Sequence, residues 1–257
     1  MPSDGGDLAG RVALVTGGGG AIGGACARAL AGVGADVVIV DLRRDAAEAR
    51  VKEIEALGRR ALALVGDAGD YPTVEALAHA ALGAMARVDV LVNVAGGGEP
   101  RPLLELTAQE FDQVLARNLK SAWNWAHCLA PQMLTRQGQR IVNTASISAK
   151  HGGGPPATVS RSAYAAAKAG VLGLTRGLAR ELAPHVTVNA VCPGLIETPP
   201  TLRITRGPDI AAIVKTIPMG RVGTPADVAA AVRFFASPAA GWITGECMDV
   251  NGGQYID

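Results

Sequence analysis

The sequence has 257 residues, a length that suits one large domain or two small ones. Hydrophobic residues make up 49% of the chain but aromatic residues only 4%, so the core must be built from Ala, Val, Leu and Ile, as in many α/β proteins. The net charge is +1 with no stripe of basic residues, which argues against nucleic acid as a partner.

No run of 18 or more apolar residues occurs, so we expect no membrane-spanning helix, and residues 1–10 lack a signal-peptide pattern. The chain contains no Cys-x-x-Cys pair, and we expect reduced thiols in a cytoplasmic protein. No cluster of His, Cys or carboxylate residues has metal-ligand spacing, so we expect no catalytic metal. The four scattered cysteines are Cys26, Cys128, Cys192 and Cys247.

The first predicted elements form a nucleotide-binding pattern. Residues 11–16 are a short apolar run, and four glycines follow at 17–20. Residues 21–33 are expected to form a helix, and residues 37–40 a second strand that ends at Asp41. Such glycines let the backbone approach a pyrophosphate, the helix N-terminus attracts its charge, and the acid accepts hydrogen bonds from a ribose. The pattern therefore predicts a dinucleotide-binding βαβ unit.

The charge of Asp41 bears on which dinucleotide binds. A carboxylate at the end of the second strand would repel a 2′-phosphate, so NAD is favoured over NADP. Arg43 and Arg44 follow closely and could hold a phosphate, but the carboxylate stands at the strand end, where the ribose should lie. NAD is therefore the expected cofactor, and NADP is less favoured.

The alternation of strands and helices continues along the chain. Residues 107–110 fit a capping box, which opens a helical region running to about Gln137. An Ala-rich helix is predicted from about residue 162 to 183, and Thr224 with Pro225 opens a later helix. Further helices are expected at 45–57 and 72–86, and further strands at 61–65, 88–92, 141–144, 186–191 and 247–250, with Cys192-Pro193-Gly194 breaking the strand before it.

Strands separated by helices predict an α/β fold, a Rossmann-type doubly wound parallel sheet of about seven strands with helices on both faces. No linker divides the chain, so residues 1–257 are expected to form one NAD(P)-binding domain. A ligand of such a sheet lies at the carboxyl ends of its strands. Six residues follow predicted strands and should gather on that rim: Gly17, Asp41, Asp67, Asn93, Ser146 and Pro193.

Tyr164 and Lys168 stand four residues apart in the Ala-rich helix, so their side chains share one face. A lysine ammonium about 4 Å away would lower the pKa of a tyrosine by about two or three units from its ordinary value of about 10. A tyrosine tuned in this way can take a proton from an alcohol or give one to a carbonyl. Taken alone, the spacing favours two ordinary surface residues, because such spacing arises often by chance.

The motifs together resemble those of the short-chain dehydrogenase/reductase family, over nearly the whole chain from Arg11 to about Tyr255. Ala21 replaces a glycine of the family's turn, Val94 replaces an asparagine, and the segment between Ser146 and Tyr164 is longer by about five residues. The segments that carry the resemblance are Thr16–Gly23, Asn93–Gly96, Asn118, Ser146, Tyr164 with Lys168, and Pro193–Thr198.

The resemblance implies roles for individual residues. Tyr164 would be the general acid/base, and Lys168 would lower its pKa and hold the nicotinamide ribose. Ser146 would hydrogen-bond the substrate oxygen, with Ser148 as a second candidate, and Asn118 would keep a water in a proton relay. Cofactor contacts are implied for Gly17, Ala21, Ile22, Gly23, Asp41, Leu42, Asp67, Ala68, Asn93, Ala95, Gly96, Tyr164, Lys168, Pro193, Gly194, Ile196 and Thr198.

The expected activity is interconversion of a secondary alcohol, or a hydroxyacyl compound, and its ketone by hydride transfer with NAD(H). One alternative is an NADPH-dependent 3-oxoacyl-thioester (acyl carrier protein) reductase, a subgroup that carries a basic residue near position 41. Another is a nucleotide-sensing protein without catalysis, against which the complete set of Asn118, Ser146, Tyr164 and Lys168 argues.

Two variable segments are expected to shape the substrate pocket. Residues 151–162 form either a pocket wall or an exposed loop, and residues 199–221 form a lid with one short helix around 209–216. The resemblance implies a homotetramer or a homodimer, and of the two tryptophans at 123 and 125, core filling is favoured over an interface role. Arg101, Arg161 and Arg203 could meet an anionic substrate, although surface arginines are usually solvated.

Overall fold

A computed structural model describes residues 6–153 and 160–256. The strands within these residues form one parallel sheet in the order β3-β2-β1-β4-β5-β6-β7. This order confirms the predicted Rossmann-type doubly wound sheet. The strands are β1 (Val12–Thr16), β2 (Asp36–Asp41), β3 (Ala61–Val65), β4 (Val90–Asn93), β5 (Gln139–Thr144), β6 (Val186–Pro193) and β7 (Cys247–Val250).

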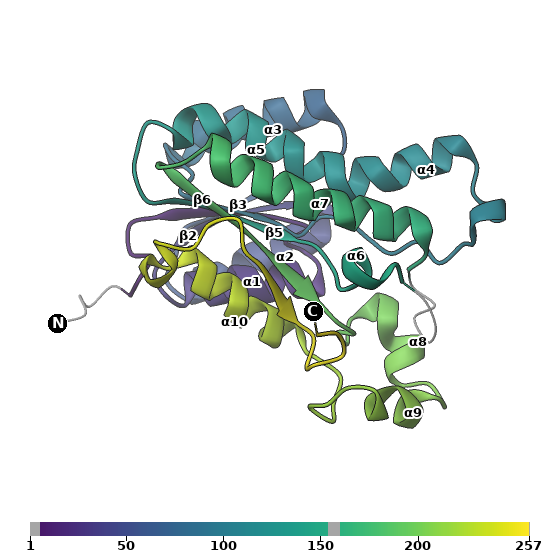
Figure 1. Ribbon diagram of the computed structural model, residues 1–257. Helices are drawn as coiled ribbons and strands as arrows, with labels where there is room; N and C mark the ends of the chain where they lie inside the picture. Colours follow the sequence, from purple (N-terminus) through teal and green to yellow (C-terminus); the bar gives the residue numbers. More distant parts are fainter. Residues whose placement is uncertain (1–5, 154–159, 257) are drawn as a thin grey trace.

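Helices cover both faces of the sheet, with α3, α5 and α7 on one face and α1, α2 and α10 on the other (Figure 1). Their bounds are α1 (Ala21–Ala31), α2 (Arg44–Ala56), α3 (Tyr71–Met85), α4 (Ala108–Leu115), α5 (Ser121–Met133), α6 (Ser148–His151), α7 (Ser162–Glu181), α8 (Leu202–Thr205), α9 (Ile210–Lys215) and α10 (Pro225–Ala236). A π-helical turn, η2 (Ala116–Lys120), joins α4 to α5, and short 3-10 turns are η1 (Leu103–Glu105), η3 (Pro199–Thr201) and η4 (Pro238–Ala240).

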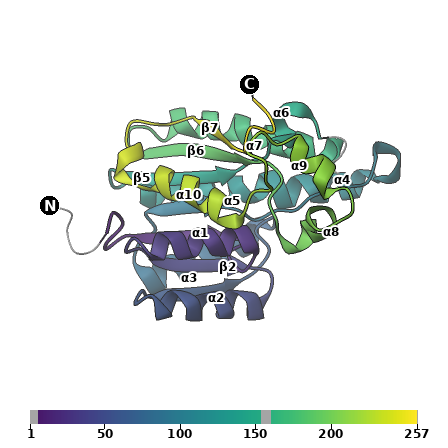
Figure 2. The same cartoon turned by 90° about the horizontal axis from the view of Figure 1, so that it is seen from below.

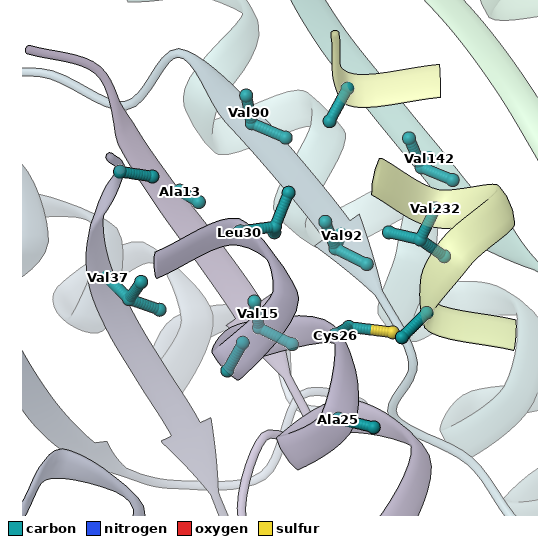
Figure 3. Close-up of a cluster of buried hydrophobic side chains, with 14 of the residues drawn as sticks. Ala13, Val15, Ala25, Cys26, Leu30, Val37, Val90, Val92, Val142 and Val232 are labelled. Carbon is teal, nitrogen blue, oxygen red and sulfur yellow. The ribbon is translucent and has the colours of Figure 1, made fainter. Parts of the chain in front are cut away.

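The core follows the two-residue period of the strands. In β1, Ala13 and Val15 face α1 and α10, whereas Leu14 packs on the opposite side with residues of α3 and α5. Figure 3 shows the hydrophobic cluster on the side of α1 and α10, in which Leu30 and Cys26 of α1 contact short side chains of the central strands. Each valine fully buried in this way contributes about 1.5–3 kcal/mol. A sheet covered on both faces leaves its carboxyl edge as the place for a ligand.

The structure agrees with the predicted helix starts that short capping motifs in the sequence indicate. Thr107 and Thr224 each form a capping box with the acid three residues later, and Asp70 caps α3 ahead of Pro72. The helical region predicted to run to about Gln137 is helical from Ala108 onward through η2, but it ends at Met133, earlier than predicted. Gly138, with φ +79°, then turns the chain into β5.

The predicted break of β6 at Cys192-Pro193-Gly194 was also wrong, since the strand runs on to Pro193. Pro193 pairs with Val250 in the parallel register, and its carbonyl accepts a hydrogen bond from the Ile147 N–H at 3.1 Å. A proline lacks only the donor, so it is accommodated as the last residue of a strand.

The predicted lid region, residues 199–221, contains α8 as well as the expected short helix, α9. Both helices project from the body of the fold on the side where β6 and β7 end (Figure 1). In the view of Figure 2, α1 and α10 lie in front of the strands while α8 and α9 stand on the side of α4 and α6. No helix among the residues that the structure describes is long and apolar enough to cross a membrane.

Candidate active site

The turn between β1 and α1 has the form of a phosphate cradle. Gly17 has φ +62°, and a Cβ there would lie 3.1 Å from Ala95. A Cβ on Gly23 would overlap the Gly17 carbonyl oxygen, so only glycine fits this contact. The N-cap residue, Gly20, offers no side chain to the first turn of α1, and the first helical bond is Gly24 N–H to Gly20 O. The amides of residues 21–23 therefore stand open at the positive end of the helix, which fits a pyrophosphate.

Asp41 ends β2 beside this cradle. Its carboxylate accepts hydrogen bonds from the Gly19 N–H and the Arg43 N–H, each at 3.0 Å. The Arg43 side chain lies 3.8 Å from the same carboxylate, whose side chain is 11% exposed. Leu42, by contrast, is exposed. The hydrogen bond from Gly19 thus joins the glycine turn to Asp41. The Asp41 carboxylate remains partly exposed, so a ribose hydroxyl could bind there.

The ends of β3 and β4 complete the cofactor side. Asp67 accepts from the Gly69 N–H at 2.8 Å, and the Ala68 carbonyl accepts from the Asn124 amide at 3.0 Å. Thr16 accepts from the N–H groups of residues 94 and 95, which ties the glycine turn to the end of β4. Asn93 is buried and donates to Asn143 at 2.9 Å. These bonds hold the Asn93–Gly96 segment against the cradle.

Asn118 reaches the site because it lies in the π-helical turn η2. Its amide oxygen accepts from the Gly97 N–H at 3.0 Å, and its amide nitrogen donates to the carbonyls of Gly97 and Val114 at 3.1 and 3.0 Å. A Cβ on Gly96 would lie 2.5 Å from the Asn118 oxygen and 3.5 Å from the Lys168 Nζ. Asn118 therefore holds the backbone after β4 next to the predicted catalytic lysine.

The two candidate serines have different partners. Ser146 follows β5, is 9% exposed, and its hydroxyl accepts the Ser148 N–H at 3.1 Å. The Ser148 hydroxyl is hydrogen-bonded to the Ser160 hydroxyl at 3.0 Å and points into that contact. The Ser146 hydroxyl also acts to lower the pKa of Tyr164, so the structure favours Ser146 as the serine that meets a substrate oxygen.

The Tyr164–Lys168 pair differs from the expected charge pair. The Lys168 Nζ donates to the Thr144 carbonyl at 2.7 Å and lies 5.7 Å from the centre of the Tyr164 ring. Burial raises the pKa of Tyr164 above its ordinary value, opposed by the hydrogen bond with Ser146. Burial also lowers the pKa of Lys168 to about 8. The expectation that Lys168 lowers the pKa of Tyr164 was therefore wrong for this structure, in which burial of the tyrosine is the dominant influence on its pKa.

The Pro193–Thr198 segment, for which the resemblance implies cofactor contacts, is supported by the C-terminal segment. The Gly194 N–H donates to the Val250 carbonyl at 3.1 Å, and the Leu195 N–H donates to the Gln254 side chain at 3.1 Å. Ile196 forms an isolated bridge with Gly223, and Thr198 caps η3 with Thr201. The contribution of Gln254 was missed, since nothing local in the sequence points to it.

Two further expectations concern the substrate side. Arg101 is held by Glu99 at 2.9 Å and by Glu110 at 2.5 Å, which makes it a poor receptor for an anionic substrate. Within the loop expected at 151–162, residues 154–159 lie outside the described residues, and His151 belongs to α6. Among the residues described, no group of three or more His, Cys, Asp or Glu could hold a metal ion.

The geometry agrees with relationships to known proteins. A family model described as Enoyl-(Acyl carrier protein) reductase matches residues 19–254. The chain is 36% identical to the 3-oxoacyl-[acyl-carrier-protein] reductase FabG of Vibrio cholerae, over 97% of this chain and 99% of that protein. It is 38% identical to a 2,3-dihydroxy-2,3-dihydro-p-cumate dehydrogenase of Pseudomonas putida, over 96% of this chain and 95% of that protein.

Among solved structures, a short chain dehydrogenase from Burkholderia cenocepacia J2315, crystallised in complex with NADP, superimposes with a TM-score of 0.88. That protein is 36% identical to this chain, and the match covers 96% of this chain and 99% of that chain. These relatives cover 96% or 97% of this chain, and the family model matches residues 19–254. The chain is a member of the short-chain dehydrogenase/reductase family and has the fold of an oxidoreductase that binds a nicotinamide cofactor.

Proposed function

We propose that the protein interconverts a secondary alcohol, or a hydroxyacyl compound, and the corresponding ketone with NAD(H). The observation that carries this proposal is the placement of Ser146, Tyr164 and Lys168 around one point. The Ser146 hydroxyl acts to lower the pKa of Tyr164, and the Lys168 Nζ lies over the tyrosine ring and close to the Asn118 side chain. The phosphate cradle at residues 17–23 lies on the same edge of the sheet.

The protein side of the reaction is proton transfer and orientation. A bound nicotinamide would accept or supply the hydride. In the oxidation direction the Tyr164 oxygen takes the hydroxyl proton of the alcohol, and Ser146 donates a hydrogen bond to the substrate oxygen on which charge develops. In reduction Tyr164 returns the proton to the carbonyl oxygen. Lys168, with its pKa lowered to about 8, is placed to exchange protons with the tyrosine near neutral pH.

The preference for NAD rests on Asp41. Its carboxylate is fixed by the Gly19 and Arg43 amides at the edge of the cradle, where it would accept hydrogen bonds from the ribose and repel a 2′-phosphate. The neighbouring Arg43 guanidinium is partly neutralised by Asp41 at 3.8 Å.

The second candidate is an NADPH-dependent 3-oxoacyl-thioester reductase, which the similarity to the Vibrio cholerae reductase supports. A titration of the enzyme with NADH and NADPH separates the two candidates. A clear preference for NADPH, together with turnover of 3-oxoacyl thioesters, would refute the NAD-dependent proposal.

A nucleotide-sensing protein without catalysis is tested by Tyr164→Phe. General acid–base catalysis contributes roughly 10²- to 10⁴-fold, so this variant should lose turnover by at least about 100-fold while its NADH dissociation constant stays within about twofold. Tyr71→Phe is the matched control, since it removes an exposed hydroxyl that bonds to His127 away from the site. Wild-type protein that binds NADH but turns over no secondary alcohol, hydroxy acid or hydroxyacyl thioester would favour the sensing role.

The assembly and the cellular location belong to the same proposal. Trp125 fills the core, whereas Trp123 is 41% exposed and stacks on His127, with the Tyr71 ring nearby. We propose that this surface is available for subunit packing in a homotetramer or homodimer, which light scattering would measure. None of the four cysteines, all of which lie in the described part of the chain, forms a disulfide, in keeping with a cytoplasmic enzyme.

A further inference from the structure

Glu99 is a buried acid that the proton-transfer chemistry does not use. It lies in the loop after β4, and its side chain is only 5% exposed. Acidic side chains are seldom buried to this degree unless they are paired. Its partners should therefore indicate what the carboxylate does.

Two arginines neutralise Glu99 from opposite directions. Arg101 donates to both carboxylate oxygens, at 2.9 and 3.0 Å. Arg117 donates to the second of these oxygens at 3.3 Å and to the Gly98 carbonyl at 3.3 Å. Hydrogen bonds from Arg101, together with the positive charge of Arg117, hold the pKa of Glu99 at about 2. Glu99 is therefore an anion over the whole range in which the enzyme would work.

Through Arg117, Glu99 is connected to the catalytic asparagine. Arg117 is the residue before Asn118 in the π-helical turn η2. The Asn118 side chain in turn makes two hydrogen bonds to Gly97, which is two residues before Glu99. Glu99 and the Asn118 amide therefore both link the loop after β4 to the π-helical turn η2.

Through its backbone, Glu99 is connected to the segment that enters α7. Glu99 forms an isolated parallel bridge with Ser160, two residues before the start of α7. The Ser160 hydroxyl bonds to Ser148, whose N–H donates to the Ser146 hydroxyl. Glu99 is therefore linked by one series of contacts to Asn118 and by another to Ser146.

We propose that Glu99 is a positioning residue, which fixes Asn118 through Arg117 and fixes Ser146 through the bridge to Ser160. This inference rests on the proposed function, because it assigns Glu99 a part in the same site. Glu99 itself does not touch the reacting atoms. Its action is to keep the side chains of Asn118 and Ser146 in place in the proposed site, where small displacements are costly.

The test is Glu99→Gln, compared with Glu110→Gln. The first substitution keeps the size of the side chain and removes the charge that holds Arg117. The second removes the other carboxylate that pairs with Arg101, at 2.5 Å, and leaves the contacts of Arg117 and Ser160 unchanged. We expect Glu99→Gln to lower kcat at least tenfold with the NADH dissociation constant within twofold, and Glu110→Gln to keep kcat within twofold.

A double-mutant cycle separates positioning from a general loss of stability. Asn118→Ala removes the amide that Glu99 is proposed to position, and Glu99→Gln leaves the backbone bridge to Ser160 in place, so Glu99→Gln should cost less than threefold more in that background. A tenfold or greater loss in both backgrounds would overturn the link through Asn118. An equal effect of Glu99→Gln and Glu110→Gln on kcat would overturn the proposal as a whole.

Amide hydrogen exchange gives a measurement that needs no turnover. Glu99→Gln should speed exchange at least tenfold in residues 97–101 and 116–120, whereas Glu110→Gln should not. Unchanged exchange in both segments would refute the positioning role even if the wild-type enzyme had no known substrate. Should Glu99→Gln fail to fold, Arg117→Met removes the same link from the other side, and unchanged kcat and exchange in that variant would equally refute the role. Loss of turnover in Tyr164→Phe with full activity in Glu99→Gln would leave the proposed function standing and this inference refuted.

Discussion

Lys168 offers a prediction in which function and stability oppose each other. Lys168 is buried, with the residue 4% exposed, and its ammonium group donates a hydrogen bond to the Thr144 carbonyl. Burial lowers its pKa from an ordinary 10.5 to about 8. At about 1.4 kcal/mol for each pKa unit, the protonated lysine costs the folded state roughly 3 kcal/mol. Lys168→Met removes this cost.

The sign of the pH dependence follows from the direction of the pKa change. Below about pH 8 the lysine is protonated in both the folded and the unfolded chain, so the cost is present in full and does not vary. Between about 8 and 10.5 the unfolded chain binds a proton that the folded chain has lost, so the stability of the wild-type protein rises with pH. Lys168→Met lacks this rise.

Urea unfolding of both proteins at pH 7 and pH 10 measures the effect, at one protein concentration because assembly also changes apparent stability. At pH 7 the free energy of unfolding of Lys168→Met should exceed that of the wild type by about 1–3 kcal/mol, since the cost of burying charge is removed. At pH 10 the difference should shrink by at least half. Turnover should fall at least about 100-fold, the range of general acid–base catalysis.

Lys52→Met is the control, because Lys52 is exposed on α2 and should show no such pH-dependent difference. A variant at position 168 that is less stable than the wild type by the same amount at both pH values would refute the reasoning. It would mean that the hydrogen bond to Thr144 contributes more than the desolvation of the charge costs.

Two further predictions concern the cofactor side of the site. Asp41→Ser should raise the ratio of kcat/KM with NADPH to that with NADH at least tenfold, because like-charge repulsion of about 3 kcal/mol at 5 Å is removed. The control is Asp45→Ser, which removes an exposed charge from the first turn of α2. An unchanged ratio in Asp41→Ser would contradict the role of the strand-end carboxylate. Gly23→Ala should lower the free energy of unfolding by about 1–3 kcal/mol and weaken NADH binding, because the new methyl overlaps the Gly17 carbonyl. Gly83→Ala, on the exposed side of α3 with nothing within 4 Å, should be neutral or slightly stabilising in the same urea titration, and equal effects of the two glycine substitutions would refute the steric argument.

Much of the fold is determined by local patterns in the sequence. The apolar runs, the helix caps at Thr107 and Thr224 and the glycine turn at 17–20 each act within a few residues. Parallel strands joined by helices must then share one carboxyl edge, so the residues after the strands were predicted to meet there, and they do. The roles assigned to those residues stay predictions.

The tertiary structure alone decided the features that depend on contacts between distant segments. The π-helical turn that carries Asn118, the burial of Glu99 between Arg101 and Arg117, and the support of Leu195 by Gln254 have no signature in the local sequence. The same holds for Lys168, whose pKa the sequence could not indicate. Helical spacing places the lysine beside Tyr164, but desolvation by surrounding segments sets its charge, and burial of that kind exists only once the whole chain has packed.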